Sequence, residues 1–173
     1  TAFSTSTGTN NANLFTATQI TVTEYAQSTP TVSGGLTGVT ATNNSGLYTG
    51  QTSTLTGAGT AKTCQYTPAY KTILVGNTPY YYDSNNNVLS GEPSAVSVPV
   101  TTSYTWTTNK PSNTTLAAAT TDVWENSLTH STGVSSQTTA TVTLTANYTV
   151  DIQGVTIQSE TKTVNITLKP QKL

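Results

Sequence analysis

The clearest indication of the fold class is the stretch Thr141-Val-Thr-Leu-Thr-Ala-Asn-Tyr-Thr-Val-Asp-Ile152. Apolar and polar residues alternate along it, a period of two that fits a half-buried β-strand and no helix. We expect the apolar face to lie on a core and the polar face to meet water. The apolar face carries Val142, Leu144, Ala146, Tyr148, Val150 and Ile152, and the polar face carries Thr141, Thr143, Thr145, Asn147, Thr149 and Asp151.

Hairpin signals lie on either side of the middle of the chain. Residues 155–168 follow a turn at Gln153-Gly154 and form the predicted partner of the strand above. Upstream, residues 70–75 and 78–83 flank Gly76-Asn77 and predict a second hairpin, followed by a turn over residues 84–87.

Two further strands are predicted outside these hairpins. Residues 95–108 read as a long strand, in which Pro99 removes a ladder donor and favours an edge position or a bulge. Residues 15–25 alternate, with Ile20 and Val22 expected to point inward.

Two regions are less regular. The Gly- and Thr-rich residues 33–59 predict short, irregular strands, and residues 112–128 fit either a short helix or a long loop. About ten short strands with turns between them predict an all-β fold. The specific expectation is a single β-sandwich, immunoglobulin-like or jelly-roll in type.

The composition excludes several classes of protein. Thr and Ser account for 43 and 17 of the 173 residues, and charged residues make up only 8%. Six Lys with no Arg do not supply the clustered positive charge that nucleic-acid phosphates require. Because no apolar run approaches the roughly 18 residues of a membrane span, no membrane insertion is expected. A single Cys forms neither an intrachain disulfide nor a Cys-based zinc site.

The chain starts at Thr1 and contains no Met. We therefore expect a processed N-terminus from which a signal peptide has been removed, and an extracellular location. The seven acidic residues also predict a weak dependence of stability on pH, since few groups titrate on unfolding.

The segment Thr1–Asn13 is a candidate interaction element. It is uncharged, lacks Pro and consists mainly of small and β-branched residues, so it can add as a strand to the sheet edge of a neighbouring molecule. A disordered leader is the alternative. If the segment is extended, Ala2, Ser4, Ser6 and Gly8 share one face, and Phe3, Thr5 and Thr7 share the other. The predicted organisation is a tail of residues 1–13 and a head of residues 14–173.

Four Asn-x-Ser/Thr sequences are candidate acceptors for N-linked glycans, at Asn43, Asn113, Asn147 and Asn165. Their number is close to chance in a chain so rich in Ser and Thr, so their positions carry more information. Asn147 and Asn165 lie opposite apolar strand faces and are expected to point into solvent.

No catalytic arrangement is visible. His130 is the only His, it accompanies no nucleophile motif, and we expect it to lie in a loop. We therefore predict no enzyme activity, no metal site and no cofactor other than glycans. One covalent option is an internal Lys–Asn bond, joining Lys62 or Lys71 to Asn147 or Asn165 with assistance from Glu160.

In organisation and composition over its whole length, the chain resembles the subunits of archaeal threads, extracellular filaments of thermoacidophilic archaea. The resemblance implies a pilin-like β-sandwich and a homopolymer built head to tail by donor-strand complementation, with a role in adhesion or biofilm. It also implies a donor strand within Thr1–Asn13, or a longer one that extends to Leu14 and Phe15. It further implies N-linked glycans at the four acceptor asparagines. The alternative is a self-contained sandwich module of a cell-surface adhesin or S-layer-associated protein, with Tyr80-Tyr81-Tyr82 as a contact patch.

Overall fold

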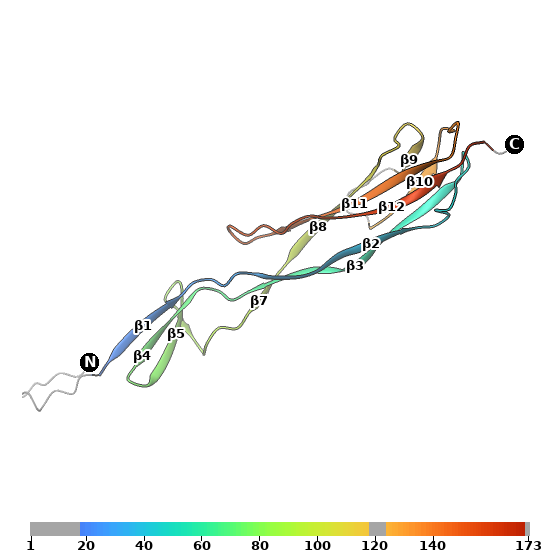
Figure 1. Cartoon of the computed structure of the whole chain (residues 1–173). Coiled ribbons are helices and arrows are strands. Elements are labelled where there is room, and N and C mark those ends of the chain that lie inside the picture. The colour runs from blue at the N-terminus through green and yellow to red at the C-terminus, as the bar shows by residue number, and fades with distance from the viewer. Residues whose placement is uncertain (1–17, 118–123, 172–173) are drawn as a thin grey trace, which may run out of the picture. The chain divides into compact units, whose positions relative to one another are not determined.

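The computed structural model describes residues 18–117 and 124–171. All regular secondary structure within these ranges consists of β-strands (Figure 1). The all-β prediction is therefore confirmed. The strands are β1 (Ile20–Tyr25), β2 (Thr31–Ala41), β3 (Thr52–Tyr66), β4 (Tyr70–Val75), β5 (Thr78–Asp83), β6 (Val88–Leu89), β7 (Val96–Val98), β8 (Val100–Thr108), β9 (Thr114–Leu116), β10 (Glu125–His130), β11 (Thr138–Val150) and β12 (Glu160–Leu168).

The described residues divide into two compact units. The small unit contains residues 18–31 and 65–97, and the large unit contains residues 32–64 and 98–171 without the undescribed 118–123. A single sandwich head is therefore not confirmed. The predicted boundary between tail and head at residues 13 and 14 lies outside the described residues and stays a prediction.

The large unit is built around β11, which contains most of the alternating residues 141–152. β11 pairs antiparallel with β12 on one side and with β8 on the other, giving the sheet order β12-β11-β8. The predicted C-terminal hairpin is thus confirmed. Its connection is longer than the expected Gln153-Gly154 turn, because the β11–β12 ladder ends at Ala146 and Glu160 while β11 continues along β8 to Val150.

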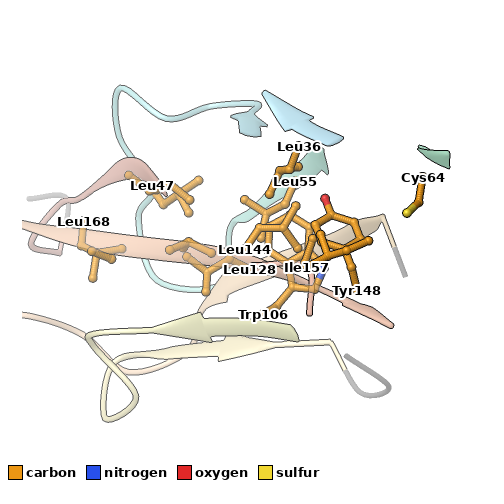
Figure 2. Packing of buried hydrophobic residues seen from close by; sticks show 14 residues of the cluster. Leu36, Leu47, Leu55, Cys64, Trp106, Leu128, Leu144, Tyr148, Ile157 and Leu168 are labelled. Atoms are coloured by element: carbon orange, nitrogen blue, oxygen red, sulfur yellow. The ribbon is translucent and has the colours of Figure 1, made fainter. Parts of the chain in front are cut away.

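One hydrophobic core serves both sheets of the large unit. Within the large unit, the second sheet has the order β2-β3-β10-β9. Figure 2 shows Leu36 and Leu55 of this sheet facing Trp106, Leu144 and Tyr148 of the first. The predicted inner face of β11 is confirmed, since its Val142, Leu144, Ala146 and Tyr148 are all buried. This arrangement is sandwich-like, with the polar faces of both sheets turned outward.

Residues 33–59 form longer strands than expected. They contribute most of β2 and the first part of β3, and two of their glycines, Gly34 and Gly59, lie where the backbones of these strands approach closely. Gly59 has φ +148°, and a Cβ there would lie 2.1 Å from the carbonyl oxygen of Gly35. Only a residue without a side chain fits where two backbones approach this closely.

Other local predictions have mixed outcomes. The predicted single strand of residues 95–108 is wrong in one respect, because it is divided at Pro99 into β7 and β8; its predicted edge position is confirmed for β8. His130 is not in a loop: it is fully buried at the end of β10, and its Nδ1 lies 2.8 Å from the Leu47 carbonyl oxygen. Residues 112–128 give β9 and β10 rather than a helix in their described part, and residues 118–123 lie outside it. Cys64 is buried.

The small unit holds one sheet, with the order β1-β4-β5-β6. The predicted hairpin of residues 70–83 is confirmed as β4 and β5, and Gly76 has φ +61° at the first position of their two-residue turn. The expectation that Ile20 and Val22 point inward is wrong, because 48% and 55% of these residues remain exposed. The described strands of this unit form a single layer, so the alternation of β1 does not lead to burial.

Replacing Leu144 by Ala should destabilise the large unit by about 2–5 kcal/mol, because the side chain is fully buried between the sheets. The measurement is the urea midpoint of unfolding. Thr139→Ala, at an exposed position of the same strand, is the matched control and should change stability by less than about 0.5 kcal/mol. Equal effects of the two substitutions would contradict the assignment of the inner face.

Candidate functional site

The sheet of the small unit exposes an apolar face. Residues directly opposite each other in an antiparallel ladder point to the same side, so the registers of β1, β4, β5 and β6 group these side chains. Val22, Tyr80 and Val88 are 55%, 48% and 75% exposed. Clusters of exposed apolar side chains of this kind mark interaction surfaces. We call this surface the apolar face; it consists of Ile20, Val22, Ile73, Val75, Tyr80, Tyr82 and Val88. The same registers place Thr78, Glu24 and Lys71 on this side of the sheet as well.

Sequence reasoning found the strands of this surface but assigned their burial wrongly. The alternation of residues 20–25 and 70–83 shows which side chains share a face, but it does not show whether a second layer covers that face. The tyrosine run is also split, because Tyr80 and Tyr82 lie on the apolar face while Tyr81 pairs with Thr72 on the other. Tyr80-Tyr81-Tyr82 therefore does not form one contact patch.

β1 leaves one side of its backbone without a partner among the described residues. It pairs only with β4 in the described sheet. Gly76 N–H donates to the Gln19 carbonyl oxygen at 2.9 Å, and these two residues are opposite each other in the extended register. Because hydrogen-bonded and non-hydrogen-bonded pairs alternate along an antiparallel ladder, the N–H and C=O groups of Ile20, Val22 and Glu24 point away from β4. This free edge offers the hydrogen bonds that a further strand requires.

The predicted donor strand falls outside the described residues. Ala2, Phe3, Ser4, Thr5, Ser6, Thr7 and Gly8 all precede residue 18, where the description starts. Their role stays a prediction.

The four glycan-acceptor sequences differ in the state of the asparagine. Asn147 and Asn165 are exposed on the outer faces of β11 and β12, and the Asn165 Oδ1 accepts from the Thr141 hydroxyl at 2.9 Å. Asn43 is exposed in a turn with φ +51°. The half-buried Asn113 differs, because its Nδ2 donates to the carbonyl oxygens of Thr132 and Gly133 at 3.2 and 3.3 Å. Since a glycan attaches through Nδ2, its attachment at Asn113 would disturb contacts that the other sites do not make.

A charged cluster lies at one end of the large unit's core. Lys62 Nζ and Glu160 Oε1 are 3.1 Å apart, with 11% and 29% of their side chains exposed. Lys62 also donates to the Gly34 carbonyl and lies 5.0 Å from the centre of the Tyr148 ring. The Leu36 N–H donates to Glu160 at 3.3 Å. A Cβ at Gly35 would lie 2.1 Å from Glu160 Oε1, so glycine there leaves room for the carboxylate.

These contacts shift the pKa values of two groups in opposite directions. Hydrogen bonding from Tyr148 lowers the pKa of Glu160, and the contacts with Lys62 and Leu36 act in the same direction. Burial, together with the neighbouring Glu160 carboxylate, raises the pKa of Tyr148 to about 12. The cluster therefore keeps Glu160 ionised and Tyr148 protonated at neutral pH, which suits a structural tie between β2, β3, β11 and β12.

The predicted Lys–Asn pairs are not brought together at this cluster. The side chain of Asn147 points to the face of β11 opposite Tyr148, and Asn165 lies on the outer face of β12. Lys71 donates instead to the Oδ1 of Asn86. Lys62 and Glu160 do form an ion pair, as the hypothesis of a Lys–Asn bond required. Neither Asn147 nor Asn165 lies beside Lys62 to complete that bond.

The remaining acidic, His and Cys residues were compared with the requirements of a metal site. No three His, Cys, Asp or Glu side chains of residues 18–117 and 124–171 are placed to hold a metal ion. No helix in the same ranges is long and apolar enough to cross a membrane. The candidate functional features of the described residues are therefore the free backbone edge of β1, the apolar face and the exposed glycan-acceptor asparagines.

Replacing Glu160 by Gln should reduce the loss of stability on acidification. A carboxyl group with a lowered pKa in the folded state stabilises the fold above its unfolded pKa, here 4.5, and loses that contribution as pH falls through the folded pKa. Urea midpoints measured from pH 6 downward, about the range where carboxylates protonate, should therefore fall less steeply for Glu160→Gln than for the parent chain. Glu125→Gln, at an exposed position of β10, is the control. A slope unchanged by Glu160→Gln would show that the cluster does not couple to folding.

Comparison with protein-family models, with curated proteins and with solved structures finds no match to this chain. The comparisons therefore assign neither a family nor an activity. What the chain does has to be argued from its own strands, edges and side chains.

Proposed function

We propose that this chain is the structural subunit of an extracellular surface filament. In this proposal, the N-terminal residues of one copy add as a strand to a neighbouring copy, and the repeated contact builds a homopolymer head to tail. The observation that carries the proposal is the free edge of β1 beside the apolar face of the same sheet. An added strand would satisfy the outward N–H and C=O groups of Ile20, Val22 and Glu24 and extend the sheet.

The energetics favour such a contact. Each ladder hydrogen bond contributes about 0.5–1.5 kcal/mol net, and burial of apolar area adds roughly 25 cal/mol per Å². A strand donated by one copy to a different surface of the next is a heterologous contact, which generates an open filament when its rotation does not close into a ring. The neutral, small side chains of Thr1–Asn13 introduce no charge that would have to be desolvated on docking.

The proposal also includes the location and the finer fold. The large unit would be an immunoglobulin-like or jelly-roll sandwich of pilin type, and the filament would lie outside the cell, with a role in adhesion or biofilm. N-linked glycans on the outer faces of β11 and β12 would coat the filament. The resemblance in composition to archaeal threads supports each of these points.

Deleting residues 1–13 should abolish filaments while leaving the rest of the chain folded. The reason is that the deletion removes the proposed donor strand and leaves in place every core residue found among residues 18–117 and 124–171. The measurement is electron microscopy of cells that express either chain, with the urea midpoint of the purified variant as the check on folding. Filaments of normal length formed by the truncated chain would rule out the donor-strand mechanism.

A single substitution tests the acceptor edge. Val22→Pro removes an N–H that points away from β4, so the β1–β4 ladder should persist while strand addition is lost. Val22→Thr retains the N–H and a β-branched side chain, and cells expressing it should keep their filaments. If Val22→Pro leaves filament length unchanged in the same micrographs, the acceptor is an edge other than β1.

The glycan acceptors provide a further test. On protein isolated from its native cell surface, Asn147→Gln and Asn165→Gln should each lower the intact mass by one glycan. Asn113→Gln should leave the mass unchanged, because the Asn113 Nδ2 already donates to two carbonyl oxygens of the chain. Intact mass spectrometry of the three variants measures the glycan mass that each one carries. A parent chain without any glycan would contradict the proposed glycan coat.

A further inference from the structure

The edge of the small unit's sheet presents different side chains on its two faces. β1 places Ile20 and Val22 on the apolar face, while Thr21 and Thr23 point to the other face. The N–H and C=O groups of Ile20 and Val22 point away from β4, as described above. A strand that adds to this edge therefore meets apolar side chains on one of its faces and threonines on the other.

Val22 begins a row of three apolar side chains. It lies opposite Ile73 of β4, and Ile73 lies opposite Tyr80 of β5. Val22 and Tyr80 remain 55% and 48% exposed. Because neighbouring strands lie about 4.7–4.9 Å apart, a side chain opposite Val22 on an added strand would extend this row. The next row begins with the charged pair Glu24 and Lys71. An apolar side chain fits better beside Val22, because beside Glu24 it would take a carboxylate out of water.

Residues 1–17 contain three large apolar side chains, those of Phe3, Leu14 and Phe15. Leu14 and Phe15 lie within six residues of Ile20, which limits their reach from β1 to roughly 20 Å. They are also consecutive, so in a strand they would point to opposite faces. Phe3 can lie ~60 Å from Ile20 in an extended chain, and the residues on either side of it are small. Phe3 is therefore the residue suited to reach the sheet of a second copy.

We propose that Phe3 of one copy packs beside Val22 of the next copy and sets the register of the donated strand. The inference rests on the proposed filament function and adds to it the residue that selects one alignment. The phenyl ring would become the fourth member of the row formed by Val22, Ile73 and Tyr80. The backbone groups of Phe3 would bond to the N–H and C=O of Val22, which point away from β4.

An antiparallel alignment is the direction of every strand pair in the described sheet of the small unit. We place Phe3 opposite Val22 in this direction. Two positions further along the ladder, on the same face, Thr5 then lies opposite Ile20. A slip of one residue would turn the phenyl ring to the threonine face and leave Val22 beside a small side chain. The single large apolar side chain of residues 1–13 thus distinguishes this alignment from its neighbours.

Moving the ring within the segment tests the face that it occupies. Phe3→Ser combined with Ser4→Phe moves the ring by one residue, to the threonine face, and leaves the composition unchanged. Filaments per cell should then fall by about tenfold or more, because burial of a phenyl ring contributes more than a tenfold change in affinity. Phe3→Thr combined with Thr5→Phe moves the ring by two residues and keeps it on the apolar face, so filaments should persist. Electron microscopy of cells with equal amounts of each chain gives the counts, and equal urea midpoints of the purified chains establish that both fold.

A cross-link tests the alignment itself. Opposite residues of a hydrogen-bonded antiparallel pair have Cα atoms about 5.5 Å apart, a distance that a disulfide spans. Thr5→Cys combined with Ile20→Cys retains Phe3, and mild oxidation of the filaments should link successive copies into a ladder on non-reducing gels. Ser6→Cys combined with Ile20→Cys is the matched control and should give no ladder, because residue 6 of the donated strand points to the opposite face. The parent chain, in which Cys64 is buried, gives the background.

The two experiments separate failure of this inference from failure of the proposed function. Equal filament counts for the two exchanges, or no ladder from Thr5→Cys with Ile20→Cys, would overturn the inference while the donor-strand mechanism stands. Filaments formed by the chain without residues 1–13 would overturn both. Loss of filaments after the one-residue exchange alone, together with the ladder, would support the role of Phe3.

Discussion

The large unit depends on the burial of one face of β11. This strand is central in its sheet, paired on both sides, and the side chains of its inner face lie against Leu36, Leu55 and Leu128 of the opposite sheet. A shift of one residue in register would turn this apolar set toward water and the threonines into the core. The pairing of β12 and β8, and with it the position of the Lys62–Glu160–Tyr148 cluster, follows from this single constraint.

The small unit shows what happens when the same strand chemistry lacks a second layer. The start of β1 alternates as β11 does, but the described residues of this unit provide no opposing sheet, and Val22, Tyr80 and Val88 remain exposed. In an isolated molecule, an edge with free backbone groups next to an exposed apolar face promotes aggregation. In an assembly, the same edge and face bind a neighbouring copy. This contrast between a filled core and an open sheet is the physical basis of the filament proposal.

Charge has a small role in the chain, and it is concentrated in a few places. With 8% charged residues, the fold relies on apolar burial and on hydrogen bonds among Thr, Ser and Asn side chains. Where charges occur near the core, as at Lys62 and Glu160, each is hydrogen-bonded to backbone as well as to its partner. In the small unit, the Asp83 carboxylate is likewise hydrogen-bonded by Asn85 and Asn87, but at the surface.

Local sequence patterns were enough to predict the all-β class, the hairpin of residues 70–83, the pairing of β11 with β12 and the edge position of the strand that contains residues 100–108. Each of these depends on local alternation or on the conformational limits of Gly and Pro. The same patterns did not determine that Ile20 and Val22 stay exposed, that His130 is buried, or that the glycines near residues 34 and 59 mark two long strands in close contact. The Tyr25–Tyr70 stack was equally out of reach, and the contact between Lys62 and Glu160 was only one of the options that the sequence left open. Alternation fixes which side chains share a face, whereas only the tertiary structure decides what, if anything, packs against it.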